Sequence, residues 1–176
     1  EGLDFRQGDL GSQAADGTAI APGGAVSLDV LIALHACDTA TDDAMHLGVR
    51  AGASIIMCAP CCHKQVRPQL LSPHPLRPIL RHGIHLGQEA EMVTDALRAL
   101  LLEASGYEAQ VFEFVSLEHT SKNKMILAVE RSVPRDPAPL LAEVQALKAF
   151  YGIREQRLET LLQGDAEAHA PSGAQR

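Results

Sequence analysis

The sequence contains no tryptophan, and aromatic residues make up only 3% of the chain. Side chains on which nucleic-acid bases could stack are therefore scarce. Long hydrophobic runs are also missing: the stretch from Val30 to Leu34 is far shorter than the roughly 20 residues that cross a bilayer. An excess of basic residues is absent too, since the formal net charge is -7. We therefore expect neither a membrane nor DNA as a partner.

The composition is that of an ordinary globular domain. The chain has 176 residues, of which 46% are hydrophobic and 21% charged, enough for one domain with a core. Its four cysteines all lie between positions 37 and 62, and Cys61 and Cys62 are adjacent. Adjacent cysteines do not suit a disulfide framework, so we expect a reduced, intracellular setting and a cytoplasmic location.

Hydrophobic periodicity predicts alternating strands and helices. The apolar run over residues 28–36 predicts a strand buried on both faces, as in a parallel sheet. The other predicted elements are a strand over 3–10, a loop over 11–27, a helix over about 39–50, a strand over 54–59, an irregular loop over 60–87, a helix over 88–105, strands over 109–117 and 124–130, and a helix over 140–162 that is interrupted at Gly152.

This order predicts an α/β fold whose sheet is mostly parallel, with one antiparallel strand near its end. The last two strands are joined by a short link, so they should form the antiparallel pair. We expect residues 1–133 to form the sheet-containing portion and residues 134–163 a helical extension. Residues 164–176 have the composition of a disordered tail.

Candidate reactive residues follow two strands that should lie side by side. His35 and Cys37 come after the first of these strands, and Cys61, Cys62 and His63 come after the second. Adjacent strands lie about 5 Å apart, and ligands bind outside the carboxyl ends of parallel strands. These imidazoles and thiols should therefore share one crevice.

The same residues form two motifs, HAC-x3-TDDA from His35 to Ala44 and APCCHK from Ala59 to Lys64. The pair resembles the methyltransferase-domain family of S-adenosyl-L-methionine-dependent enzymes, in the neighbourhood of the acceptor-stem tRNA 2′-O-methyltransferases. The resemblance extends over roughly residues 3–130. It implies a Rossmann-like fold, methyltransferase activity and S-adenosyl-L-methionine as the cofactor.

The resemblance also implies cofactor contacts. Asp9 and Leu10 match the place where an acidic residue approaches the adenine, and His35 and Ala36 match the strand end that faces the transferred methyl group. The Gly-rich loop for the methionine end and the acid that holds the ribose have no counterpart, and both would lie before Glu1. The resemblance therefore implies the C-terminal part of a methyltransferase domain, lacking its first strands and binding cofactor weakly alone.

Methyl transfer to a hydroxyl or amine requires that the acceptor be positioned and lose its proton. His35 and His63 are the candidate bases, because an imidazole gains and loses a proton near neutral pH. Cys61 and Cys62 are expected to shape the pocket or contact the acceptor.

Lys64 and Arg67 are the candidate substrate-binding residues. They belong to a segment, residues 63–87, that carries several basic side chains and no acidic one. Such a segment could hold the phosphates of an RNA acceptor, and an ordinary solvated loop is the alternative.

A second class of function is a non-catalytic metal-binding or RNA-binding module on the same fold. Cys58-x2-Cys61 has zinc-ligand spacing, which His35, Cys37 or His63 would complete. We nevertheless expect no metal, because Cys58 should point into the sheet as a buried structural thiol and no second Cys-x2-Cys exists.

Several other polar residues are expected to have ordinary roles. Asp42 and Asp43 are typical charges at the start of a helix. His46, His82, His85 and His169 are expected to lie on the surface.

Overall fold

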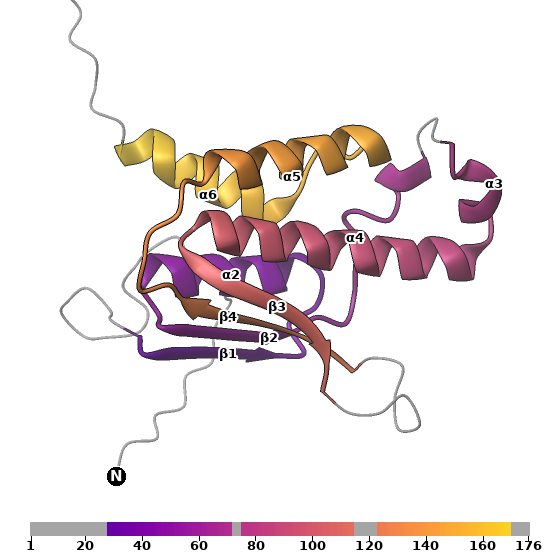
Figure 1. Cartoon of the computed structure of the whole chain (residues 1–176). Coiled ribbons are helices and arrows are strands. Elements are labelled where there is room, and N and C mark those ends of the chain that lie inside the picture. The colour runs from indigo at the N-terminus through magenta and orange to yellow at the C-terminus, as the bar shows by residue number, and fades with distance from the viewer. Residues whose placement is uncertain (1–27, 72–74, 115–122, 170–176) are drawn as a thin grey trace, which may run out of the picture.

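The computed structural model describes residues 28–71, 75–114 and 123–169 (Figure 1). The predicted strand over 3–10 and loop over 11–27, with Asp9 and Leu10, lie outside these ranges. The elements follow in the order β1 (Val30–Leu34), α2 (Thr39–Arg50), β2 (Ile55–Ala59), a 3-10 turn η1 (Gln69–Leu71), α3 (Arg77–Leu80), α4 (Gly83–Ala104), β3 (Tyr107–Glu113), β4 (Lys124–Glu130), α5 (Ala138–Tyr151) and α6 (Arg157–His169).

The four strands form one sheet in the order β1-β2-β4-β3. β1 and β2 are parallel, whereas β4 is antiparallel to both of its neighbours, so β4 alone runs against the other three described strands. The prediction of an antiparallel final pair is confirmed. The prediction of a mostly parallel sheet is wrong, because among the described strands only β1 and β2 form a parallel pair. β4 lies between β2 and β3, where Ile126 and Ala128 are buried.

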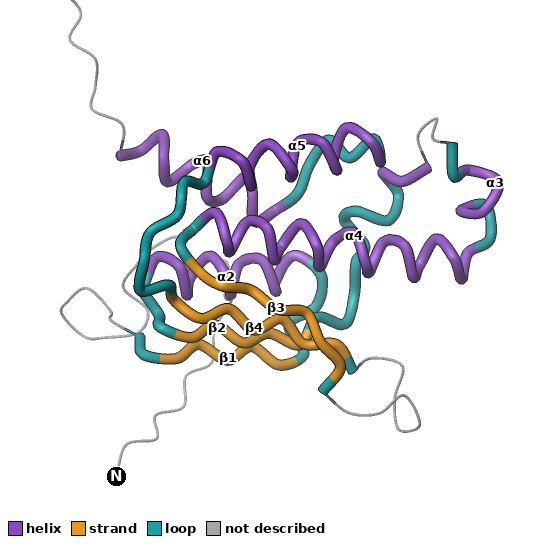
Figure 2. Tube along the Cα trace, in the orientation of Figure 1, coloured by secondary structure: helices purple, strands orange, loops and turns teal. Residues whose placement is uncertain are grey.

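The four long helices of the described ranges, α2, α4, α5 and α6, lie on one side of the sheet in two layers (Figures 1 and 2). α2 packs on β1 and β2, and α4 packs on β3 and β4. α5 lies against α4, and α6 lies against α2. The contact between α2 and the sheet is close at Gly48, since a Cβ there would lie 2.8 Å from the Ile56 side chain. None of the helices in the described ranges is long and apolar enough to cross a membrane.

The opposite face of the sheet is apolar and exposed along β1. Leu31 is buried against the helices, but Val30, Ile32 and Leu34 are 48%, 60% and 58% exposed. The expectation of a strand buried on both faces is therefore wrong for the described part of the chain. The apolar composition of β1 was correctly assigned to a strand, but no described helix covers its second face (Figure 2).

The helices differ from the prediction mainly at their ends. α4 begins at Gly83 rather than at residue 88, and η1 and α3 occupy part of the predicted irregular loop. The predicted helix over 140–162 is two helices, because Gly152 ends α5 in a left-handed conformation with φ of 71°. α6 then continues to His169, through the first residues of the predicted disordered tail.

Candidate functional site

The turn between β1 and α2 has an unusual backbone. His35 and Asp38 have φ of 60° and 55°, a region that residues other than glycine rarely occupy. Such conformations persist only where neighbouring groups hold them. Here the Thr41 hydroxyl donates a hydrogen bond to the Ala36 carbonyl oxygen, so the first turn of α2 fastens the strand end.

Two further hydrogen bonds hold Asp38, one at its backbone carbonyl oxygen and one at its side-chain carboxylate. The Arg98 Nη2 donates to the Asp38 carbonyl oxygen at 2.8 Å, and the Gln65 backbone N–H donates to the Asp38 carboxylate at 3.1 Å. The second bond joins the turn after β1 directly to the loop after β2. The side chain of Cys37, between the two strained residues, is left exposed.

Arg98 on α4 is the centre of a buried polar network. Its side chain is 1% exposed and forms a two-pronged ion pair with Asp42, at 3.0 and 2.7 Å, and a second contact with Asp95 at 3.2 Å. Burial alone would lower the pKa of the guanidinium. Hydrogen bonds to Asp42 and the charges of both carboxylates outweigh that effect and raise this pKa.

This network adds to the predicted role of Asp42. The carboxylate lies in the first turn of α2, as predicted, but it is also buried and accepts a hydrogen bond from Gln156 at 2.6 Å. Asp43 does lie near the start of α2, but it pairs with Arg157 at 2.9 Å. Both aspartates therefore connect α2 to the C-terminal helices.

His63 extends the network to the candidate site. Its Nε2 lies 3.1 Å from Oδ1 of Asp95, and both side chains are buried. With Asp95 as a carboxylate, Nε2 carries the hydrogen, and the Nδ1 atom of a neutral ring is then the acceptor. The contacts run from His63 through Asp95 and Arg98 to Asp42.

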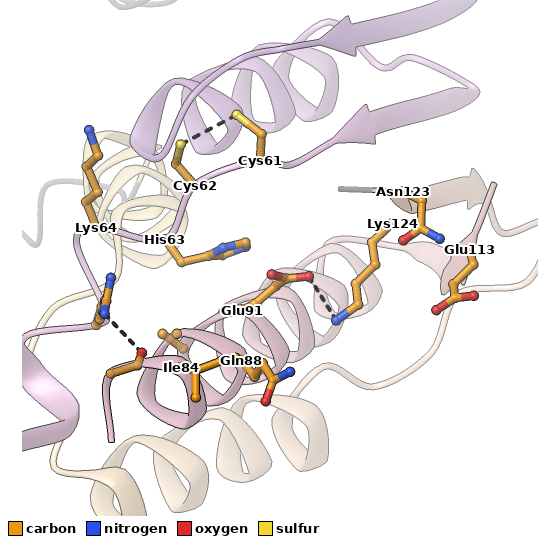
Figure 3. A pocket seen from close by; sticks show the side chains of 14 residues that line it. Cys61, Cys62, His63, Lys64, Ile84, Gln88, Glu91, Glu113, Asn123 and Lys124 are labelled. Atoms are coloured by element: carbon orange, nitrogen blue, oxygen red, sulfur yellow. Dashed lines mark hydrogen bonds and ion pairs between the residues drawn. The ribbon is translucent and has the colours of Figure 1, made fainter. Parts of the chain in front are cut away.

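A pocket of about 640 Å³ lies at the ends of β2, β3 and β4 (Figure 3). Five predicted site residues line it and are thus brought together: Cys61, Cys62, His63, Lys64 and Arg67. The other two predicted residues that are described, His35 and Ala36, are not among its lining residues. They occupy the neighbouring strand end, where Leu34 is in register with Ala59.

The opposite wall of the pocket was missed by the sequence analysis. It consists of Gln88 and Glu91 on α4, Glu113 at the end of β3, and Asn123 and Lys124 at the start of β4. Lys124 pairs with Glu91 at 3.0 Å. The absence of acidic residues from residues 63–87 is a property of the segment only, and the complete pocket carries both signs of charge.

A weak signal for the buried network was present in the sequence. In the helix over 88–105, Arg98 lies three and four residues before Leu101 and Leu102, and Asp95 lies seven residues before Leu102, so both charges border the apolar face. A charged residue on the apolar face of a helix is costly unless it is paired.

His46 on α2 does not lie on the surface, where it was expected. It is 4% exposed, and its Nε2 lies 2.8 Å from the Asp165 carboxylate.

Three thiols gather beside the pocket. The Sγ atoms of Cys37 and Cys61 are 3.2 Å apart, those of Cys61 and Cys62 are 3.6 Å apart, and all three lie within 4.8 Å of one another. The hydrogen bond between Cys61 and Cys37, followed by burial and the proximity of Cys62, raises the pKa of the Cys61 thiol to about 12.

Cys58 lies apart from this group, as expected. Its side chain is 0% exposed in the core, and burial is the main cause that raises its pKa to about 12. The Cys58-x2-Cys61 spacing thus does not bring its two thiols to one site.

The side chain of Gln69, in the 3-10 turn η1, bonds to the segment between α5 and α6. Its amide nitrogen donates to the Glu155 carbonyl oxygen at 2.8 Å, and its amide oxygen accepts from the backbone N–H groups of Arg154 and Glu155 at 2.8 and 3.0 Å. The segment between α5 and α6 is therefore bound to the loop that follows β2.

Together these features define an α/β domain with a pocket at the carboxyl ends of β2 and β3 and the amino end of β4, lined by charged residues of both signs. A family model described as a methyltransferase domain matches residues 11–69 of the chain. The match includes both strand-end loops and thus His35, Cys61, Cys62 and His63. No curated protein and no solved structure matches the chain.

Proposed function

We propose that the chain acts as part of a methyltransferase that uses S-adenosyl-L-methionine. The observation that carries the proposal is the match of a methyltransferase-domain model to residues 11–69, which contain the strand-end loop lining the pocket. A pocket at this edge of the sheet is where open α/β folds bind ligands. The cofactor supplies an electrophilic methyl group on a sulfonium.

His63 is the proposed base for the acceptor. It lines the pocket, and Asp95 fixes the orientation of its ring through the 3.1 Å contact. The cofactor would supply the methyl group to an acceptor hydroxyl or amine, and the His63 imidazole would take up the proton that the acceptor loses.

The cofactor would lie beside the turn from His35 to Asp38. Hydrogen bonds from Thr41 and Arg98 hold this turn in place next to the loop that lines the pocket, which suits a position facing the methyl group. The adenine and ribose contacts would come from residues outside the described ranges, Asp9 and Leu10 among them.

We extend the proposal to a longer catalytic unit of which this chain is the C-terminal part. The support is the sheet itself: within the described ranges, no strand pairs with the outer edge of β1, and Val30, Ile32 and Leu34 are exposed. A preceding segment that completed the cofactor crevice would cover this apolar surface, and the four described strands would then be the later strands of a Rossmann-like sheet.

The acceptor that we propose is RNA. Lys64 and Arg67 form an exposed basic wall of the pocket, and Arg77 and Arg81 lie in and just after the nearby helix α3. Phosphates are the RNA groups that such side chains hold. A relation to the acceptor-stem tRNA 2′-O-methyltransferases, which the two motifs suggest, belongs to this proposal.

The test is transfer of a labelled methyl group by the parent chain that includes the preceding residues. Total RNA, a protein extract and a small-molecule extract serve as separate acceptors, each with wild-type protein and with His63→Ala. We expect label in the RNA fraction with the wild type only. Absence of transfer to every fraction, together with absence of cofactor binding, would contradict the proposed activity.

A further inference from the structure

We propose that Cys37, Cys61 and Cys62 bind a thiophilic metal ion, with Zn²⁺ the ion that this donor set fits best. Among the described residues, the three Sγ atoms form a group within 4.8 Å of one another. Zinc is bound by cysteine sulfur in tetrahedral sites, whereas Mg²⁺ and Ca²⁺ prefer oxygen. This inference does not depend on methyl transfer.

The distances match a common metal centre. With zinc–sulfur bonds of about 2.3 Å at tetrahedral angles, neighbouring sulfurs are separated by about 3.8 Å. The observed separations are 3.6 Å for Cys61 and Cys62 and 3.2 Å for Cys37 and Cys61. The Cys37 and Cys62 sulfurs lie within 4.8 Å of each other. Shifts of no more than about 1 Å, within the reach of side-chain torsions, would bring all three pairs to the tetrahedral spacing.

The backbone holds the three ligands together before any ion arrives. Cys37 follows β1 and the other two cysteines follow β2, yet the bond from the Gln65 N–H to the Asp38 carboxylate ties the two loops together. Arg98 holds the same turn from the buried side through the Asp38 carbonyl oxygen. Zinc would therefore meet a largely formed site, which lowers the cost of ordering its ligands.

The site would also be accessible. Cys37 is exposed, and Cys61 and Cys62 line the pocket. Three protein ligands leave one tetrahedral position for water or a pocket ligand, which is the arrangement of catalytic rather than closed structural zinc sites. The ion would lie at the edge of the pocket that contains His63.

The experiment uses the full chain, reduced with a phosphine and then freed of excess reductant. Co²⁺ is titrated in, and the sulfur-to-cobalt charge-transfer absorption reports thiolate ligation. Zn²⁺ affinity is then obtained by competition with a chromophoric chelator. We expect one equivalent of metal, and Cys37→Ser, Cys61→Ser and Cys62→Ser should each weaken Zn²⁺ binding by more than about 100-fold, since losing a mere outer partner of a ligand costs about 10- to 100-fold.

Cys58→Ala is the matched control, because it removes the fourth thiol of the chain without touching the group. It should keep one equivalent of metal and the wild-type charge-transfer band, and circular dichroism confirms that each variant is folded. Metal binding that survives in folded Cys37→Ser, or that is lost in folded Cys58→Ala, would overturn the assignment. Absence of binding in the reduced wild type would overturn it too. The assignment would likewise fail if a Cys37–Cys61 disulfide formed in air at the same rate with and without added Zn²⁺.

Discussion

His63 and Asp95 are 32 positions apart in the sequence, and their side chains meet at 3.1 Å between Nε2 and Oδ1. The contact joins the loop after β2 to the middle of α4. Because Arg98 reaches the same carboxylate oxygen at 3.2 Å, the orientation of the imidazole depends on a charge network beneath the pocket. The first prediction follows from this arrangement.

On the proposed function, His63→Gln should lower kcat for methyl transfer by about 10²- to 10⁴-fold, the usual contribution of a general base. The dissociation constant of S-adenosyl-L-methionine should change little, because His63 lies on the acceptor side of the proposed site. Steady-state kinetics and calorimetric titration measure the two quantities. His82→Gln, an exposed histidine outside the pocket lining, is the control, and an equal loss of kcat in both variants would argue against a base at position 63.

Arg98→Met should destabilise the chain by about 3 to 5 kcal/mol, because it leaves the buried carboxylates of Asp42 and Asp95 without their cation. Urea unfolding followed by circular dichroism measures the change. Arg157→Met removes a more exposed arginine, 39% accessible and paired with Asp43. That control should cost no more than about 1 kcal/mol. Similar losses in the two variants would show that burial of the Arg98 network adds nothing.

Cys58 should make the stability of the chain fall at alkaline pH. Burial raises the pKa of its thiol from 9.0 to about 12, so the folded state retains a proton that the unfolded state loses between these values. The stabilising effect is complete below pH 9 and is lost as the pH rises toward 12. Urea unfolding of wild type and Cys58→Ala at pH 7 to 11, in reductant, should show the gap in stability narrowing. A gap that stays constant would contradict the buried neutral thiol.

Cofactor affinity should differ between this chain and an N-terminally extended parent. Calorimetry should show weak or no binding of S-adenosyl-L-methionine to residues 1–176 and clear binding to the extended protein. The physical reason is that, on the proposed function, the Gly-rich loop for the methionine end and the acid for the ribose have no counterpart in residues 1–176. Equal and tight affinity in both proteins would refute the idea of an incomplete crevice.

Neutralising Lys64, Arg67, Arg77 and Arg81 in the parent should weaken RNA binding with little effect on folding, because all four are exposed. Each lost phosphate contact should reduce the slope of log affinity against log salt by about 0.7 to 0.9. Binding measured across a salt series reports both effects. An unchanged slope would favour a protein or small-molecule acceptor. The comparison is a variant with four glutamines at exposed charged positions in and around α5, namely Arg135, Glu143, Arg154 and Glu155.

The elements with clear periodicity could be predicted, and the connections between them only in part. β4 was placed correctly because Lys124–Glu130 is apolar and bounded by polar segments. Its insertion between β2 and β3 was not predicted, since strand order depends on contacts between distant segments. The start of α4 was missed because Gly83 and Gly87 are poor helix formers, and packing overcame their low propensity.

The candidate site was predicted to a similar extent. Cys61, Cys62 and His63 were found because they follow a buried strand directly, where the fold brings reactive groups together. Asp95 and Arg98 were missed because their importance arises from what they face across the helix layer. A sequence pattern gives the spacing of residues along one element, but it does not give the partner that a side chain meets on another.

The bonds of Gln69 to Arg154 and Glu155 have a consequence for how the molecule opens. Local unfolding proceeds in contiguous cooperative units, and segments joined by several hydrogen bonds open together. Because one side chain satisfies three backbone groups between α5 and α6, the docking of these helices and the order of the loop after β2 belong to one such unit. We therefore expect α5 and α6 to detach before the loop after β2, which forms one wall of the pocket, can unfold.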